Sequence, residues 1–223
     1  MDVTEAVKRR ISVRAFKPDP VPEAVVREIL DLAKQAPSGG NLQPWRVYVL
    51  AGAELDRFRA LVRERMNVTP MGEPPQYEIY PKGLWDPYRA RRSECGEDLY
   101  ASIGVAREDK FARLLHVARN FEFWGAPVGL FFCLDRRLGP PQWSDVGMFM
   151  QTLMLLAVER GLDTCAQEAW AMWPDTVAEF LGLPEELMLF AGMALGVRDE
   201  SAPINGLRTR REPVDGFAEL RGF

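Results

Sequence analysis

Two short segments near the start of the chain constrain it more than any other sequence feature. The first, Arg9–Arg14, places three arginines and Ser12 directly after a short amphipathic stretch. The second, Pro37–Trp45, is rich in small and polar residues and leads into the strand-like run Arg46–Leu50. Guanidinium groups bind phosphate through paired N–H donors, and glycine lets main chain approach a ligand without an intervening Cβ. The two segments therefore predict a site in which arginines hold a phosphate and a loop lies against a flat ligand.

The composition indicates one globular domain and argues against several kinds of partner. The chain has 223 residues, of which 47% are hydrophobic, and this is enough for one substantial core. A formal net charge of -4 and a pI of about 5.3 argue against a protein that grips nucleic acid by its phosphates. We find no apolar run of membrane-spanning length and no signal peptide. Three cysteines without a close pair suit a reducing compartment, so we expect a cytoplasmic protein.

The histidine count narrows the chemistry further. His116 is the single histidine, which excludes a histidine-rich metal site and any catalytic relay that needs a second one. It lies within Arg107–Asn120, a helix-like run with apolar residues around it, so we interpret it as a partly buried helix residue. We predict no metal site. If the protein is an enzyme, its chemistry belongs to a cofactor.

Apolar spacing predicts the regular elements. Helices are expected over residues 2–10, 23–36, 53–65, 107–120, 145–160 and 174–181, and strands over 45–50, 128–134, 161–165 and 188–197. Because helices and strands do not alternate strictly, an α+β architecture fits better than a doubly wound sheet. No glycine-rich dinucleotide fingerprint follows a strand, so a Rossmann site is unsupported. We expect a single domain over residues 1–223.

One long segment, residues 66–100, breaks this regular pattern. It holds five prolines, several aromatic residues and a cluster of arginines. Long irregular segments in compact domains are usually lids or linkers, and the aromatic content argues against disorder. We therefore predict a lid-like insertion. Its candidate contacts with substrate or cofactor are Tyr80, Trp85, Tyr88, Arg91 and Arg92, and the substrate candidates among them are Trp85, Tyr88 and Arg91.

Two later segments complete a pattern with the opening pair. They are Gly161–Trp170, and Gly192–Gly196 followed by Pro203–Pro213. In this order the four segments resemble the FMN-dependent nitroreductase family, and the resemblance spans nearly the whole chain. It implies an α+β fold with a mixed sheet flanked by helices. It also implies an intertwined homodimer with an FMN at each of two interface sites, built from both subunits.

The resemblance also assigns roles to individual residues. The positions that match contacts to the FMN phosphate and ribityl chain are Arg10, Ser12 and Arg14. Arg211 matches a second phosphate-binding position, Arg208 is a weaker candidate, and the choice among Arg208, Arg210 and Arg211 stays open. The loop that the partner subunit lays against the flavin ring matches Pro37, Ser38, Gly39 and Asn41. The segment at the other edge of the ring, where a backbone N–H reaches flavin N5, matches Ala166, Gln167, Glu168 and Ala169.

The resemblance implies an oxidoreductase without a dedicated catalytic side chain. FMN would take hydride from NADH or NADPH at N5, beside the backbone near Glu168, and would reduce a small aromatic acceptor by a ping-pong route. Nitroaromatics and quinones are the acceptors that the family implies. Three alternatives stay open: a reductive dehalogenase of the same fold, a flavin-consuming enzyme, and a non-catalytic FMN-binding protein. Neither nucleic acid nor membrane is an expected partner.

Overall fold

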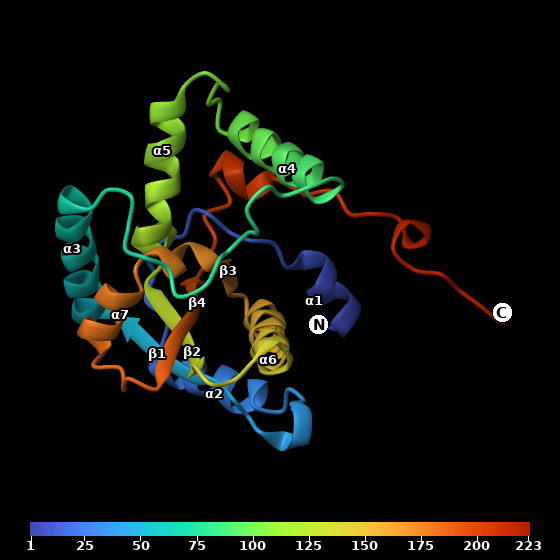
Figure 1. Ribbon diagram of the computed structural model, residues 1–223, viewed down its shortest axis with the longest axis horizontal. Coiled ribbons are helices and arrows are strands. Elements are labelled where there is room, and N and C mark those ends of the chain that lie inside the picture. Colours follow the sequence, from blue (N-terminus) through green and yellow to red (C-terminus); the bar gives the residue numbers. More distant parts are fainter.

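Two apolar strands form the centre of the sheet in the computed structural model, which describes residues 1–223. These are β2 (Val128–Asp135) and β4 (Leu187–Gly196), and the edge strands are β1 (Arg46–Ala51) and β3 (Asp163–Gln167). The strand order is β1-β2-β4-β3, and every neighbouring pair runs antiparallel. A bulge after Phe132 shifts the register between β2 and β4. Helices cover both faces, and this explains why β2 reads as a continuous apolar run (Figure 1).

The helices and short 3-10 turns surround this sheet. The α-helices are α1 (Val3–Arg9), α2 (Glu23–Ala33), α3 (Gly52–Val68), α4 (Tyr88–Ser102), α5 (Lys110–Ala118), α6 (Pro140–Glu159) and α7 (Pro174–Leu181). The 3-10 turns are η1 (Gly39–Asn41), η2 (Arg119–Gly125), η3 (Glu168–Met172), η4 (Pro203–Gly206) and η5 (Val214–Gly216). No helix combines the length and the apolar character that crossing a membrane requires.

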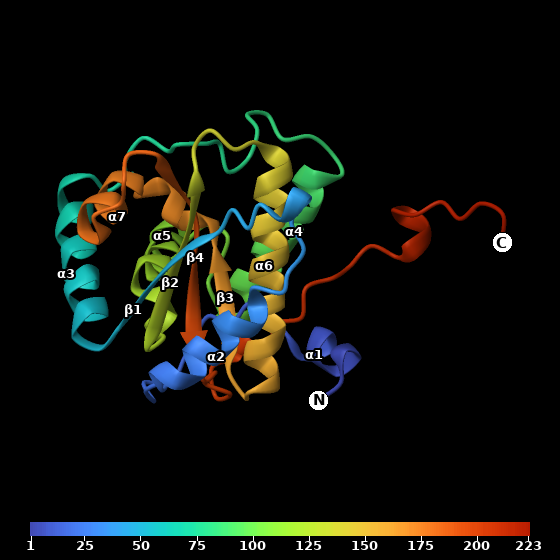
Figure 2. The same ribbon diagram turned by 90° about the horizontal axis from the view of Figure 1, so that it is seen from below.

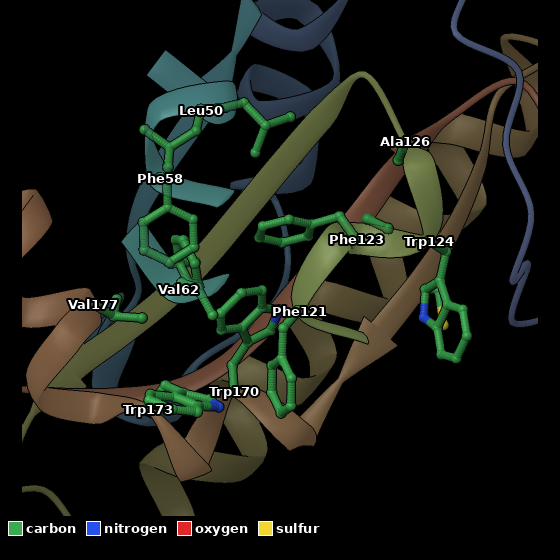
Figure 3. Packing of buried hydrophobic residues seen from close by; sticks show 14 of the residues in the cluster. Leu50, Phe58, Val62, Phe121, Phe123, Trp124, Ala126, Trp170, Trp173 and Val177 are labelled. Carbon is green, nitrogen blue, oxygen red and sulfur yellow. The ribbon is translucent and has the colours of Figure 1, made fainter. Parts of the chain in front are cut away.

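Two hydrophobic clusters hold the layers together, one on each face of the sheet. On one face, α2 and α6 pack against alternate residues of β2 and β4, including Leu130 and Met193. On the other face, Phe58 of α3 contacts Phe131 with ring centroids 5.2 Å apart and Trp170 with centroids 5.3 Å apart (Figure 3). A Cβ at Gly192 would lie 2.2 Å from Cδ1 of Trp170, so only glycine admits this ring. Trp170 thereby fixes η3 against β4.

The α+β class is confirmed, but the sheet is less mixed than the resemblance implied. All four strands are antiparallel to their neighbours, and the one parallel pairing is an isolated bridge between Ser12 and Thr164. The chain leaves the sheet edge at once because Val13 and Phe16 turn into the core. The Ser12 segment is therefore too short to count as a fifth strand.

Most predicted elements are found, and the largest difference lies in residues 66–100. Residues 88–102 form α4 and are not irregular. This helix has no buried residue, so it lacks the apolar periodicity by which a helix is recognised in sequence. The predicted helix over 145–160 also begins earlier, at Pro140, where proline occupies the first helical turn.

The first part of the same segment is fixed to the body of the protein. The Glu73 carboxylate accepts hydrogen bonds from the backbone N–H groups of Asp175, at 2.8 Å, and Thr176, at 3.0 Å, and so caps α7. The Tyr77 hydroxyl donates to the Phe190 carbonyl, and the Leu189 N–H donates to Gln76 at 3.2 Å. Residues 73–77 therefore form a strap over α7 and β4. The lid function of the remaining residues stays a prediction.

His116 is a buried residue of α5, as its sequence context indicated. Its ring packs between Trp124, at a centroid distance of 5.0 Å, and Tyr100, at 5.9 Å. Its Nε2 atom is buried without a hydrogen-bond partner. Burial, followed by the positive charges of Arg119 and Arg14, lowers the pKa of His116 to about 4.

The pKa of His116 predicts a loss of stability in mild acid. The imidazole is neutral in the folded protein, whereas in the unfolded chain its pKa is about 6.5. The stability that this group contributes is therefore present above pH 6.5 and lost progressively as the pH falls from 6.5 toward 4. Urea unfolding at pH 7.5 and pH 5 measures the effect. We expect the unfolding free energy to fall more for the wild type than for His116→Gln, and equal losses would contradict the assignment.

Candidate functional site

Two arginines from opposite ends of the chain lie near each other, and neither is paired with a carboxylate. Arg10 caps α1, and Arg211 lies in the carboxyl-terminal tail. Partial burial, followed by the nearby positive charge of Arg211, lowers the pKa of Arg10. Neither side chain takes part in an ion pair, although most other arginines of the protein do. Their positive charges are therefore available to an anion.

Arg14 belongs to the same cationic cluster. Burial raises the pKa of Cys165, and the nearby charges of Arg14 and Arg10 oppose this effect, so both arginines lie close to Cys165 on β3. The Arg14 backbone N–H donates to Oδ1 of Asn205 at 2.9 Å, and its guanidinium donates to the Ser12 carbonyl at 3.3 Å. Like Arg10, Arg14 has no carboxylate partner.

Hydrogen bonds to β3 and to the tail hold this arginine-bearing segment in place. The Val13 N–H donates to the Thr164 carbonyl at 3.0 Å, beside the Ser12 bridge. The buried Asn205 side chain donates to the carbonyls of Ala15 and Asp199, each at 2.8 Å. Arg198 forms a largely buried ion pair with Asp163 at the start of β3. The arginines are thus presented by a rigid frame.

The structure separates the three arginines of the tail, which the sequence could not do. Arg210 points to α4, where its guanidinium pairs with Asp98 at 3.2 Å and Glu94 at 3.5 Å. Arg208 and Arg211 donate hydrogen bonds only to backbone carbonyls and the Thr209 hydroxyl. Arg211 is the one whose charge acts on Arg10. Arg211 therefore belongs to the cluster, Arg208 stays a candidate, and Arg210 serves to attach the tail.

The other end of β3 carries the segment predicted to meet the flavin ring. Glu168 begins η3, and no side chain caps the start of this turn. The first N–H groups of a helical turn have no acceptor within the turn, so they can bind a ligand. Although Glu168 lies at the surface, the surrounding protein desolvates its carboxylate and raises its pKa. Thr164 and Glu168 are four residues apart on an extended chain, which corresponds to roughly 13 Å.

The neighbours of Glu168 divide into exposed and inward-facing residues. Ala166 is exposed and Ala169 is half-buried, so their backbone is accessible. The Gln167 side chain is buried and donates to the Asn120 carbonyl at 2.7 Å, while its own oxygen accepts from Trp170. Gln167 therefore fixes the turn, and only its backbone is available to a ligand.

The loop that contains Pro37, Ser38, Gly39 and Asn41 is anchored elsewhere. The Gly39 N–H donates to Oδ2 of Asp145 on α6 at 3.2 Å, and the Gln43 N–H donates to the Ser38 hydroxyl at 3.0 Å. Gly40, Asn41 and Gln43 have positive φ angles, between 49° and 57°. For Asn41 and Gln43 this conformation is unfavourable, so the loop is held in a strained shape.

Within one chain, this loop and the arginine cluster do not meet. No hydrogen bond or ion pair connects them, and the loop and α1 lie near opposite ends of α6 (Figure 2). Twenty residues of α-helix extend about 30 Å, so opposite ends of α6 are far apart. The two halves of the predicted flavin site are therefore separate in a single subunit.

The substrate candidates of the 66–100 segment lie together on the surface at the start of α4. Trp85 and Tyr88 are both exposed, and their rings meet edge to face with centroids 5.7 Å apart. Arg91 is ion-paired with Glu212 of the tail at 2.7 Å. The charge of Arg91 is therefore largely neutralised, and its contact with an anionic acceptor stays a prediction.

Comparison with known proteins identifies the family. Residues 7–197 match the model of the Nitroreductase family. The chain is 57% identical over 212 residues to a protein of Thermus thermophilus named NADH dehydrogenase, covering 95% of this chain and 92% of the relative. It is 39% identical over 222 residues to 4-nitrobenzoate reductase of Pseudomonas putida, covering 100% of this chain and 96% of the relative. The chain belongs to the nitroreductase family.

A solved structure supports this assignment. The fold superimposes with a TM-score of 0.97 on the FMN and NADPH-dependent nitroreductase NfnB of Sphigopyxis sp. strain HMH. The two proteins are 45% identical, and the match covers 100% of both chains. The resemblance inferred from the four sequence segments is thereby confirmed at the level of family and fold.

Two residues of the site were not identified from the sequence. Asp145 is only 5% exposed. The signal available in the sequence was a carboxylate within a helix rich in apolar residues. The apolar pattern places it at the start of the helix, where a carboxylate is common, but the helix begins five residues earlier. Asn205 is buried and bonds to two segments, a role that its surface-like sequence context did not indicate.

The buried Asp145 carboxylate leads to a prediction about the Gly39 loop. In Asp145→Ala the Gly39 N–H loses its acceptor, and the strained loop loses a charge-assisted hydrogen bond worth about 1.5–3 kcal/mol. We expect FMN to bind about tenfold or more weakly, as measured by fluorescence titration of the apoprotein. Asp145→Asn keeps an acceptor and should restore most of the affinity. Wild-type affinity in Asp145→Ala would contradict the role of this contact.

Proposed function

We propose that this protein is an FMN-dependent nitroreductase that uses NADPH to reduce nitroaromatic compounds. The observation that carries the proposal is the cluster of Arg10, Arg14 and Arg211, three guanidiniums without carboxylate partners. The FMN phosphate is close to a dianion, and charge-assisted hydrogen bonds from such a cluster neutralise it. The donor set therefore fits FMN.

Each part of the site has a distinct task in this proposal. Arg10, Arg14 and Arg211 bind the phosphate, and the Ser12 hydroxyl contacts the adjoining chain of the cofactor. The uncapped backbone N–H groups near Glu168 orient the ring edge that includes N5. When bound, FMN supplies the hydride relay between the nicotinamide and the acceptor. No side-chain acid or base is required, which agrees with a single, buried and neutral histidine.

The names of the relatives support the choice of acceptor and suggest a second candidate. One relative is named 4-nitrobenzoate reductase, and the structural neighbour is described as FMN and NADPH-dependent. The relative named NADH dehydrogenase favours, as a second candidate, NADH as the electron donor. The acceptor of this second candidate would be the quinone that the sequence resemblance implies. In both cases donor and acceptor use the same flavin face in turn, so the kinetics are ping-pong.

We propose that the protein is located in the cytoplasm, because its three cysteines are free and suit a reducing compartment.

We further propose that the flavin sites form in a homodimer. The tail extends away from the body of the subunit (Figures 1 and 2) and exposes Val214, Phe217, Leu220 and Phe223. Exposed apolar surface of this kind typically marks an interface. A second chain would bring its Gly39 loop to the arginine cluster, from which the loop of the same chain is separated. In this proposal Pro37, Ser38, Gly39 and Asn41 act in the partner's site.

The exposed residues at the start of α4 are the proposed acceptor contacts. Trp85 and Tyr88 present ring faces on which an aromatic acceptor could stack, while Arg91 is tied to Glu212. We therefore assign Trp85 and Tyr88 to acceptor selection and expect a smaller effect from Arg91. These residues belong to the proposed lid over the single domain.

Anaerobic spectroscopy tests the function directly. The purified protein should carry about one FMN per chain, and NADPH should bleach the flavin band. Adding the acceptor 4-nitrobenzoate should restore the band, and initial rates at varied concentrations of both substrates should give parallel double-reciprocal lines. If neither NADPH nor NADH bleaches the bound flavin, the protein is a non-catalytic FMN-binding protein and the proposal is wrong.

The ion pairs of the tail predict that substitution of two neighbouring arginines has unequal effects on FMN binding. Arg211→Ala removes an unpaired phosphate ligand and should weaken FMN binding by about one to two decades, or roughly 1.5–3 kcal/mol. Arg210→Ala removes a guanidinium already paired with Asp98 and should change the FMN dissociation constant by less than about threefold. Fluorescence titration of each apoprotein provides the measurement. Equal effects of the two substitutions would refute the phosphate assignment.

The exposed tail predicts that dimer formation and flavin retention are linked. Burial of a phenylalanine side chain contributes about 1.5–3 kcal/mol, so Phe217→Ala should weaken the dimer by about tenfold or more. Deletion of residues 214–223 should weaken it further and release FMN together with the partner. Val68→Ala, at an exposed valine of α3, is the matched control. A flavin-loaded monomer at micromolar concentration in light scattering would contradict the dimeric site.

A further inference from the structure

A long open groove follows one exposed face of α4, outside the residues assigned to FMN. It has a volume of about 950 Å³, and its walls include Tyr80, Leu84, Tyr88, Arg92 and Leu99. Small-molecule sites in proteins typically have volumes of roughly 300–1,000 Å³. The groove is therefore large enough for a nucleotide.

Arg92 differs from the neighbouring arginines because it has no carboxylate partner. Arg89 is paired with Asp86, and Arg91 is paired with Glu212. The Arg92 guanidinium instead lies over the ring of Tyr80, 4.4 Å from its centroid, and forms no ion pair. Stacking on an aromatic ring leaves the N–H donors at the edge of the guanidinium plane free to bind an anion. The groove thus contains one available cationic group.

The groove also offers exposed aromatic rings. Tyr80 and Tyr88 lie in its wall, and about half of each side chain is exposed, 49% and 51% respectively. Aromatic side chains stack on nucleobases, and each such contact is worth roughly 1–3 kcal/mol. An aromatic wall beside an unpaired arginine suits a ligand that carries both a base and a phosphate.

The groove is close to the proposed phosphate site of FMN. Arg91 and Cys95 line both the groove and a smaller cavity of about 200 Å³, whose other walls include Arg211. The two spaces therefore adjoin each other at Arg91 and Cys95 of α4. A nicotinamide dinucleotide is long enough for its adenosine half to lie in the groove while its nicotinamide reaches the flavin.

We propose that this groove binds the adenosine half of NADPH, with Arg92 contacting the 2′-phosphate and the aromatic wall contacting the adenine. The proposal rests on the proposed function. NADPH differs from NADH only by the 2′-phosphate, so a guanidinium that contacts this group selects NADPH. Arg92 is then the residue that determines the choice of donor, a point on which the names of the relatives differ.

Steady-state kinetics of the holoenzyme with both dinucleotides tests the proposal. With 4-nitrobenzoate as acceptor, Arg92→Ala should lower kcat/KM for NADPH by about ten- to hundredfold, mainly through KM, and change the value for NADH by less than about twofold. Arg57→Ala, which removes an arginine paired with Glu54 on α3, outside the groove, is the matched control and should alter neither value. The FMN content of each variant verifies that it is folded.

Titration with adenosine 2′,5′-bisphosphate gives an independent readout. The wild-type holoenzyme should bind this compound more tightly than adenosine 5′-monophosphate, and Arg92→Ala should abolish the difference. Equal losses for NADPH and NADH, or an effect confined to the Michaelis constant for the nitroaromatic acceptor, would overturn the proposal. If neither NADPH nor NADH reduces the flavin of the wild-type holoenzyme, that result contradicts the proposed function alone. The titration would then still decide whether the groove binds the nucleotide.

Discussion

The approach of Arg10 and Arg211 is the interaction on which the rest of the site depends. Two guanidiniums brought together without a carboxylate repel each other, and folding maintains this arrangement through other contacts. Asn205, the Ser12–Thr164 bridge and the Asp163–Arg198 ion pair hold the two chain ends in place. A dianion relieves the repulsion. Because the frame is already formed, little conformational entropy is lost when the ligand binds.

Strand β3 connects the arginine cluster to the turn near Glu168 that is proposed to contact the flavin ring. Thr164 holds the arginine-bearing segment, and Glu168 begins the uncapped turn η3 at the other end of the strand. Trp170 fixes η3 through its close packing on Gly192, and Gln167 ties the same turn to Asn120. The hydrophobic core therefore sets the distance between the proposed phosphate site and the proposed ring site, and substitutions in the core should affect cofactor binding as well as stability.

The sequence predicted the elements whose buried residues form a regular apolar pattern. The strands over 128–134 and 188–197 were recognised as apolar runs, and the helix over 174–181 was found with the same bounds. Helix α4 was missed because none of its residues is buried. The choice among Arg208, Arg210 and Arg211 depends on carboxylates of that helix, so no local pattern could make it. The bond between Asp145 and Gly39 likewise joins segments 106 residues apart.

The affinity of the apoprotein for FMN compared with riboflavin tests the central claim most directly, because the two ligands differ only in the phosphate. If unpaired arginines are held ready for that group, FMN should bind at least about a hundredfold more tightly at low salt. The difference should shrink as ionic strength rises, because salt screens charge interactions. Equal dissociation constants for the two ligands would contradict the account, since the arginine cluster would then serve another purpose.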